Sequence, residues 1–176
     1  MPDSREMGEA TELADQTVLC IVTRSPEETA DVGRRLGEVL RVGDVVLLSG
    51  TLGAGKTTLA QGIAAGMGID DYVTSPTFVL VNEYRPGRRG VALFHADLYR
   101  IGTPAEAFEL LLDDYVRDGA MVVEWAERAP EAAPTDHLLI RLEPTGEDER
   151  RITITAHGER HRELLERIAA QGRTTW

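Results

Sequence analysis

The folds open to this 176-residue chain are restricted most by one segment, Gly50-Thr51-Leu52-Gly53-Ala54-Gly55-Lys56-Thr57. It matches the pattern G-x-x-x-x-G-K-[ST], in which glycines let the backbone approach phosphate oxygens. An apolar stretch of strand length, residues 44–49, precedes the segment. After it, Leu59, Ile63 and Met67 recur at intervals of four residues, which indicates a helix with one buried face. The segment therefore lies between a strand and a helix, the setting that a P-loop requires.

The residue types in this loop predict how it binds a nucleoside triphosphate. The loop N–H groups and the start of the following helix form an anion site. Lys56 is expected to bind the β- and γ-phosphates, and the hydroxyl of Thr57 to hold Mg²⁺. Lys56 is the only lysine beside 18 arginines, so lysine occurs only where a compact ammonium group is needed. The residues expected to bind the nucleotide are Gly53, Ala54, Gly55, Lys56, Thr57 and Thr58.

Composition predicts one soluble globular domain. Apolar residues make up 42% of the chain and charged residues 28%, and no apolar run approaches the roughly 20 residues of a membrane span. Residues 1–16 carry five acids and one arginine and are expected to form a disordered acidic tail, with the domain at 17–176. The polar start argues against a signal peptide, and the single cysteine, Cys20, against disulfides. We expect a cytoplasmic protein with Cys20 buried as a small apolar residue.

Apolar patterns and turn residues predict the other elements. Strands are expected at residues 18–22, 44–49, 78–84, 91–95, 120–125, 137–142 and 151–155, and helices from Ser25 to about Leu40, after the P-loop as far as Gly66–Gly68, after Thr103, and at 159–170. The strands at 78–84 and 91–95 flank a Pro/Gly turn and are expected to form a β-hairpin. The helix after the capping box at 103–106 should bury Phe108, Leu111, Leu112 and Tyr115.

A P-loop needs a further carboxylate to fix Mg²⁺, usually at the end of a neighbouring apolar strand. Two acids satisfy this condition. Glu124 ends the stretch Met121-Val122-Val123, and Asp97 follows residues 93–96. We assign Glu124 to the metal and Asp97 to orienting the attacking water or supporting the metal from further away, and the reverse assignment stays open.

Four features near these acids each allow two interpretations. Thr77 follows a serine and a proline in a loop that could sense the γ-phosphate, or it simply begins a strand. Trp125 packs in the core, or it contacts a nucleobase or a partner. His95 is structural, with metal ligation the weaker alternative. The arginines at 85–89 form a solvated turn, or they contact a partner or a phosphate.

Several absences restrict the chemistry. No N-K-x-D segment is present to read guanine, and neither an arginine-rich lid nor an arginine finger can be identified. An NTPase without such a finger hydrolyses slowly until a partner supplies positive charge. The net charge of −11 argues against unaided binding of nucleic acid, so an RNA substrate would have to be held by another subunit.

Taken together, four motifs resemble the TsaE family in order and spacing. They are Gly50-Thr51-Leu52-Gly53-Ala54-Gly55-Lys56-Thr57-Thr58, Ser75-Pro76-Thr77-Phe78, His95-Ala96-Asp97-Leu98-Tyr99-Arg100 and Val123-Glu124-Trp125-Ala126-Glu127. The resemblance covers about residues 18–154. It implies an α/β fold, a P-loop NTPase-like sandwich with a mixed, largely parallel central sheet flanked by helices.

The resemblance also implies a function. The ligands would be ATP and Mg²⁺, with Mg²⁺ on Thr57 and Glu124, and Thr77, Asp97 and Trp125 would matter for hydrolysis or coupling. The implied partners are TsaD, which transfers the threonylcarbamoyl group, and TsaB, with tRNA reached only through that complex. ATP hydrolysis would reset the complex during formation of N6-threonylcarbamoyladenosine. Two alternatives stay open: a small-molecule kinase, disfavoured because the loop after Glu124 has only Arg128, and a nucleotide-gated binding module.

Overall fold

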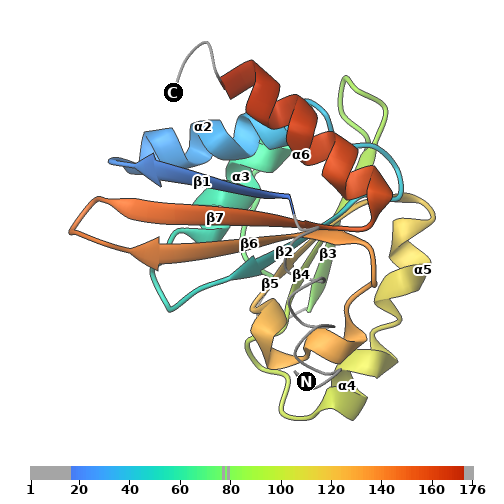
Figure 1. The fold of residues 1–176 in the computed structure, drawn as a ribbon. Coiled ribbons are helices and arrows are strands. Elements are labelled where there is room, and N and C mark those ends of the chain that lie inside the picture. Colours follow the sequence, from blue (N-terminus) through green and yellow to red (C-terminus); the bar gives the residue numbers. More distant parts are fainter. Residues whose placement is uncertain (1–16, 77, 79, 173–176) are drawn as a thin grey trace, which may run out of the picture.

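The computed structural model describes residues 17–172 apart from 77 and 79, and Figure 1 shows a sheet with helices on both faces. The strands are β1 (Val18–Thr23), β2 (Val45–Ser49), β3 (Val81–Tyr84), β4 (Ala92–Asp97), β5 (Gly119–Glu124), β6 (His137–Pro144) and β7 (Arg150–His157). The helices are α2 (Pro26–Gly37), α3 (Lys56–Gly66), α4 (Pro104–Glu109), α5 (Leu112–Val116) and α6 (Glu159–Gly172), with short 3₁₀ helices η1 (Ala126–Arg128) and η2 (Pro130–Ala132).

The seven strands form one sheet in the order β1-β7-β6-β2-β5-β4-β3. The four central strands, β6, β2, β5 and β4, run parallel to one another. Both edges are antiparallel, because β7 pairs antiparallel with β6 and β1, and β3 with β4. The predicted mixed, largely parallel sheet flanked by helices is therefore confirmed. None of the helices in this described part of the chain combines the length and apolar character needed to cross a bilayer.

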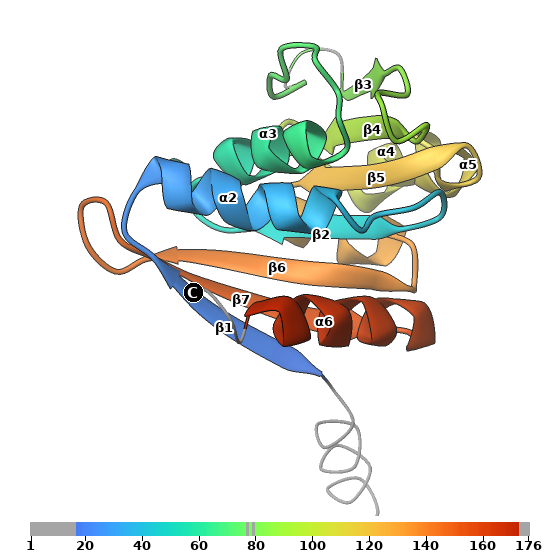
Figure 2. The same cartoon turned by 90° about the horizontal axis from the view of Figure 1, so that it is seen from above.

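Two hydrophobic cores lie between the sheet and the helices, one on each face of the sheet. Helices α2, α3 and α6 cover one face, and α4, α5, η1 and η2 cover the other (Figures 1 and 2). Val46 and Leu48 of β2 contribute to the first core with Ile63 of α3, and Val45 and Leu47 contribute to the second. Because successive residues of a strand point to opposite faces, β2 is buried on both sides. The loop that follows β2 therefore starts from a strand in the buried centre of the sheet.

Helices α2 and α3 pack unusually closely because each carries two glycines four residues apart. An ideal Cβ atom on Gly37 would lie 2.0 Å from a backbone oxygen of α3, and one on Gly62 would lie 2.1 Å from the backbone oxygen of Ala30. Gly33 and Gly66 are enclosed in the same way. Gly66 was predicted only to end the helix, and its sequence pattern does not reveal this contact. Since α3 begins at the P-loop, the glycines fix the position of the helix that follows this loop.

The hairpin of β3 and β4 is confirmed, but its first strand is shorter than predicted. β3 begins at Val81, whereas the prediction was residue 78. Phe78 is 85% exposed, and Leu80 has a φ of 72° while its N–H donates to the backbone oxygen of Pro76. The chain therefore turns before the strand begins, which the β-forming residue types at 78–84 did not reveal.

The predicted single helix after Thr103 is wrong in its length and in part of its buried face. Leu111 has a left-handed φ of 49°, which separates α4 from α5. Phe108 and Leu111 are consequently exposed, at 53% and 61%. Leu112 is buried as predicted, and Tyr115 is half-buried with its ring centre 5.1 Å from that of Phe94.

Cys20 is exposed, so the prediction of a buried cysteine is wrong. It lies on β1, the outermost strand of one sheet edge, where residues alternate between a buried and an exposed side. Ile21 and Thr23 point into the first core, while Val18, Cys20 and Val22 point to the exposed side. Residues 18–22 are all apolar, so their types do not show that only one side of this strand is buried.

One arginine of the basic turn has a structural role that neither interpretation anticipated. Arg89 donates hydrogen bonds from Nη1 to the backbone oxygens of Gly37 and Leu40. These carbonyl groups lie at the end of α2, where no intrahelical donor remains. Arg89 thus ties the hairpin turn to α2.

A buried histidine joins α6 to the start of the P-loop strand. His161 is 1% exposed, and its Nε2 accepts a hydrogen bond of 3.1 Å from the backbone N–H of Val45. Beside it, Arg160 binds both carboxylate oxygens of Asp44. Burial lowers the pKa of His161, opposed by Asp44 and assisted by His137. The pKa of His137 is also lowered, mainly by burial.

We expect the free energy of unfolding to fall as the pH drops below about 6.5, the pKa of an unfolded histidine. Because the pKa of His161 is lower in the folded protein, the unfolded chain binds more protons below about pH 6.5. The contribution of His161 to the free energy of unfolding is therefore fully present only above that pH. One such group contributes a slope of at most about 1.4 kcal/mol per pH unit. Urea denaturation at several pH values between about 5 and 8 measures how the free energy of unfolding depends on pH. His161→Gln, whose amide oxygen can still accept from Val45, should flatten this dependence; an unchanged slope would contradict this origin.

Candidate nucleotide-binding site

The site lies where three parallel elements of the sheet end and α3 begins. β2 leads into the loop at residues 50–55, and Lys56 is the first residue of α3. On the neighbouring strands, Asp97 ends β4 and Glu124 ends β5, and the two acids are partners in the parallel register. Each is only 2% exposed. The two carboxylates that the sequence singled out therefore stand side by side, next to the P-loop.

The loop backbone requires glycine and leaves open space above it. Gly53 and Gly55 have φ values of 77° and 106°, in the left-handed region that side chains disfavour. A Cβ atom on Gly53 would meet nothing within 4 Å. Ala54 is fully buried. The exposed side of the loop is thus free to receive a phosphate group.

The backbone carbonyl groups of the loop hold the side chain of Lys56. The residue is 5% exposed, and Nζ donates to the backbone oxygens of Gly50, at 2.5 Å, and Thr51, at 2.9 Å. Nζ also lies 3.7 Å from the centre of the Trp125 ring. Burial lowers the pKa of Lys56, and the carboxylates of Glu127, Glu124 and Asp97 oppose this shift.

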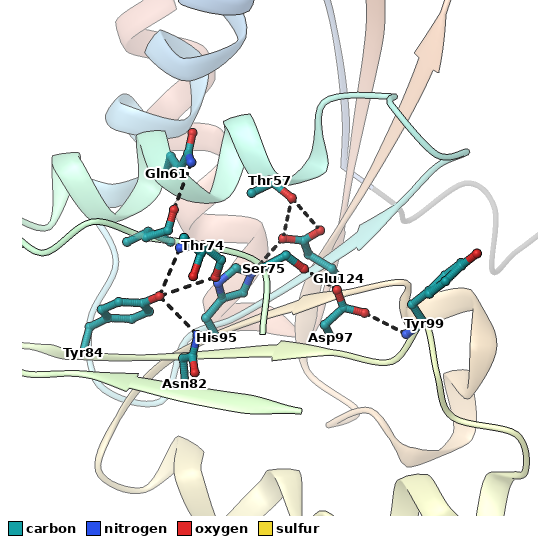
Figure 3. A network of polar contacts seen from close by, with 11 residues as sticks. Thr57, Gln61, Thr74, Ser75, Asn82, Tyr84, His95, Asp97, Tyr99 and Glu124 are labelled. Carbon is teal, nitrogen blue, oxygen red and sulfur yellow. Dashed lines mark hydrogen bonds and ion pairs between the residues drawn. The ribbon is translucent and has the colours of Figure 1, made fainter. Parts of the chain in front are cut away.

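Glu124 is the centre of the polar network in Figure 3. The Thr57 hydroxyl donates to the carboxylate, with its Oγ1 3.2 Å from Oε1 and 3.1 Å from Oε2. His95 Nε2 lies 2.8 Å from Oε1. Asp97 has different partners, because its Oδ2 accepts from Ser75 Oγ and its Oδ1 from the N–H of Tyr99 at 2.7 Å.

The donors around Thr57 fit a magnesium ion. Mg²⁺ prefers oxygen ligands and usually takes one or two carboxylates together with substrate phosphates and water. Thr57 and Glu124 supply a hydroxyl and a carboxylate within hydrogen-bond distance of each other. Within the described residues, no cluster of three or more His, Cys, Asp or Glu side chains could hold a metal by itself. Thr57 and Glu124 thus offer two oxygen ligands of the kind that Mg²⁺ takes beside phosphates and water.

A cavity of about 420 Å³ brings most of the predicted residues together. It is lined by Leu52, Gly53, Gly55, Lys56, Thr57, Thr58, Ser75, Asp97, Tyr99, Glu124 and Trp125. Of the predicted set, Ala54 does not line it, and Thr77 lies outside the described residues. A larger cavity, of about 660 Å³ between β1 and α2, contains no P-loop residue and is not a candidate for this chemistry.

Core packing, one of the two interpretations of Trp125, is confirmed in part, and a contact with a nucleobase or a partner stays a prediction. Trp125 packs partly against the second core, and its ring also covers Lys56 and contacts Tyr99, with ring centres 4.8 Å apart. Its φ of 58° marks a sharp change of direction directly after Glu124. Ser75 and Tyr99 were not predicted as partners of Asp97, although both belong to the motifs named above.

These features define the class of protein: a P-loop nucleotide-binding protein. The sequence model of the family described as "Threonylcarbamoyl adenosine biosynthesis protein TsaE" matches residues 23–152. The chain belongs to the TsaE family. The family resemblance found in the sequence is thereby confirmed.

Individual relatives agree with this assignment. The chain is 41% identical over 148 residues to a protein of Bacillus subtilis (strain 168) named tRNA threonylcarbamoyladenosine biosynthesis protein TsaE, covering 84% of this chain and 91% of that one. It is 45% identical over 139 residues to a protein of the same name from Mycobacterium tuberculosis (strain H37Rv), covering 75% and 83%. The crystal structure of YdiB from B. subtilis superposes with a TM-score of 0.76 at 36% identity, covering 89% and 97%.

Proposed function

We propose that this chain is an ATPase that acts in the formation of N6-threonylcarbamoyladenosine in tRNA. The observation that carries the proposal is the contact between the P-loop hydroxyl of Thr57 and the buried carboxylate of Glu124, beside Lys56 in one cavity. This is the arrangement that a Mg²⁺-nucleotide site of this class needs. The pathway comes from the names of the relatives, which are 41–45% identical to the chain.

Each residue has a distinct task in this proposal. Lys56 leaves the carbonyl groups of Gly50 and Thr51 and binds the β- and γ-phosphates, while loop N–H groups bind phosphate oxygens. Thr57 and Glu124 hold Mg²⁺, which when bound neutralises charge on the phosphates. Asp97 orients the attacking water. Thr77, whose position is not described, is proposed to sense the γ-phosphate.

We further propose that partner proteins control the rate. The described residues that line the cavity include no arginine, and Lys56 is their only cation. Arg128 lies outside this lining, with its guanidinium carbon 5.2 Å from the centre of the Tyr99 ring and 5.9 Å from that of the Trp125 ring. In this proposal the charge stabilisation that an arginine finger supplies comes from a partner. The partners proposed are TsaD and TsaB. Since the chain carries a net charge of −11, we propose that it reaches tRNA only through that complex. We place this function in the cytoplasm, as expected for tRNA modification.

The proposal predicts slow ATP hydrolysis by the purified chain and acceleration by TsaD–TsaB. Because the missing charge would come from the partners, we expect an increase of at least about tenfold. Phosphate release, measured alone and with the partners, gives the rates, and Lys56→Ala is the inactive control. Equal rates with and without TsaD–TsaB would break the link to that complex. Transfer of the phosphoryl group to a small acceptor would then favour the kinase alternative.

A further inference from the structure

His95 contacts Glu124 from outside the cavity that the P-loop lines. It is fully buried on β4 and does not line the 420 Å³ cavity, whereas Thr57 and Glu124 both do. On the same strand, Asp97 lies two residues further on and therefore points to the same face of the sheet. Figure 3 shows the imidazole between β4 and the carboxylate of Glu124. His95 can thus act on the site only through another residue.

The contact between His95 and Glu124 is a hydrogen bond in which the histidine is the donor. A carboxylate can only accept a hydrogen bond, so the 2.8 Å contact means that Nε2–H of His95 donates to Oε1 of Glu124. Nδ1 of His95 is buried and has no hydrogen-bond partner in the part of the chain that the structure describes. The contact with Glu124 is therefore the one polar contact of the ring found there, and it fixes the Nε2–H tautomer.

This contact restrains the side chain that must meet the metal. The glutamate side chain has several rotatable bonds, and ordering it costs conformational entropy. His95 anchors Oε1 from behind, while the Thr57 hydroxyl contacts both oxygens from the cavity side. If the Thr57 hydroxyl were to bind a metal ion instead, the His95 contact would still hold Oε1 of Glu124.

We propose that His95 is a positioning residue that holds the Glu124 carboxylate in the orientation needed for Mg²⁺. The inference rests on the proposed function, because it assumes that Glu124 is the metal ligand. It goes beyond that function by giving a role to a buried histidine that does not line the cavity. Groups that orient metal ligands in this way typically change metal affinity about 10–100-fold when they are removed.

Two substitutions separate positioning from mere packing. His95→Gln keeps an N–H donor that can reach Glu124, whereas His95→Met fills a similar volume without a donor. If the ring only fills space, the apolar methionine should be tolerated at least as well as the glutamine. If it positions Glu124, only the glutamine variant should retain Mg²⁺ binding.

The readout is Mg²⁺-dependent binding of ADP, measured by titration calorimetry at a series of Mg²⁺ concentrations, which needs no turnover. We expect His95→Met to raise the Mg²⁺ concentration for half-maximal tightening of ADP binding about tenfold or more, and His95→Gln to change it less than about threefold. ADP binding without Mg²⁺ should be unchanged in both, which also shows that the variants fold. If methionine unfolds the protein, His95→Asn, too short to reach Glu124, replaces it.

The outcomes distinguish the two proposals. Wild-type protein that binds ADP with no effect of Mg²⁺ would overturn the metal site, and with it the proposed function. Wild-type protein with a clear Mg²⁺ effect that His95→Met leaves intact would overturn only the role of His95. Equal losses in the glutamine and methionine variants would assign His95 to packing.

Discussion

Replacing Glu124 with glutamine is expected to lower the rate of ATP hydrolysis by about 100-fold or more, while ADP without Mg²⁺ still binds. The amide has nearly the same size, and its oxygen can still accept hydrogen bonds from Thr57 and His95, so the fold is retained. The negative charge that would balance Mg²⁺ is lost. Hydrolysis with excess TsaD–TsaB and Mg²⁺-free ADP binding are the two measurements.

A matched acid serves as the control for this experiment. Glu131 lies in η2 and is exposed, so Glu131→Gln should leave hydrolysis unchanged. If Glu124→Gln hydrolyses ATP normally and Asp97→Asn does not, the roles of the two acids are reversed. If Glu124→Gln stops hydrolysis and tRNA modification survives, the chain is a nucleotide-gated binding module and its ATPase activity is incidental.

Replacing Gly62 with alanine is expected to remove a large part of the stability of the domain. In an exposed helix this change would stabilise the fold by up to about 1 kcal/mol, because alanine favours helices. Here the added Cβ atom would lie 2.1 Å from the backbone oxygen of Ala30, and only separation of α2 from α3 relieves that contact. Overpacking of this kind costs about 1–3 kcal/mol or more, out of a typical 5–15 kcal/mol.

Urea denaturation of the wild-type protein and of Gly62→Ala measures the difference in their free energies of unfolding. The sign of that difference decides whether the added Cβ atom destabilises the fold. Gly146→Ala is the control, since a Cβ atom there would meet its nearest neighbour, Cβ of Glu149, at 3.4 Å. It should change the free energy of unfolding by about 0.5 kcal/mol or less. An increase in stability for Gly62→Ala would show that the two helices can move apart at little cost.

Local sequence patterns predicted most helices and strands, but not the residues at which β3 and α4 begin or end. The alternation of strands and helices, the capping residues Ser25 and Thr103, and the hairpin were predicted, because propensity and turn chemistry act over a few residues. The failures at Phe78 and Leu111 have one cause. At each place a non-glycine residue, Leu80 or Leu111, has a left-handed φ. Non-glycine residues adopt this conformation too rarely for a local pattern to predict it.

The sequence by itself determined the phosphate loop, the strand and helix beside it, and the acids at 97 and 124. These follow from local backbone chemistry, since glycines, a lysine and a hydroxyl at fixed spacing make a phosphate site wherever a strand leads into a helix. Only the tertiary structure decided that His95 reaches Glu124, that Trp125 covers Lys56, and that paired glycines bring α2 against α3. Those contacts join residues far apart in the chain, and their geometry depends on how the strands are ordered and how closely the helices pack.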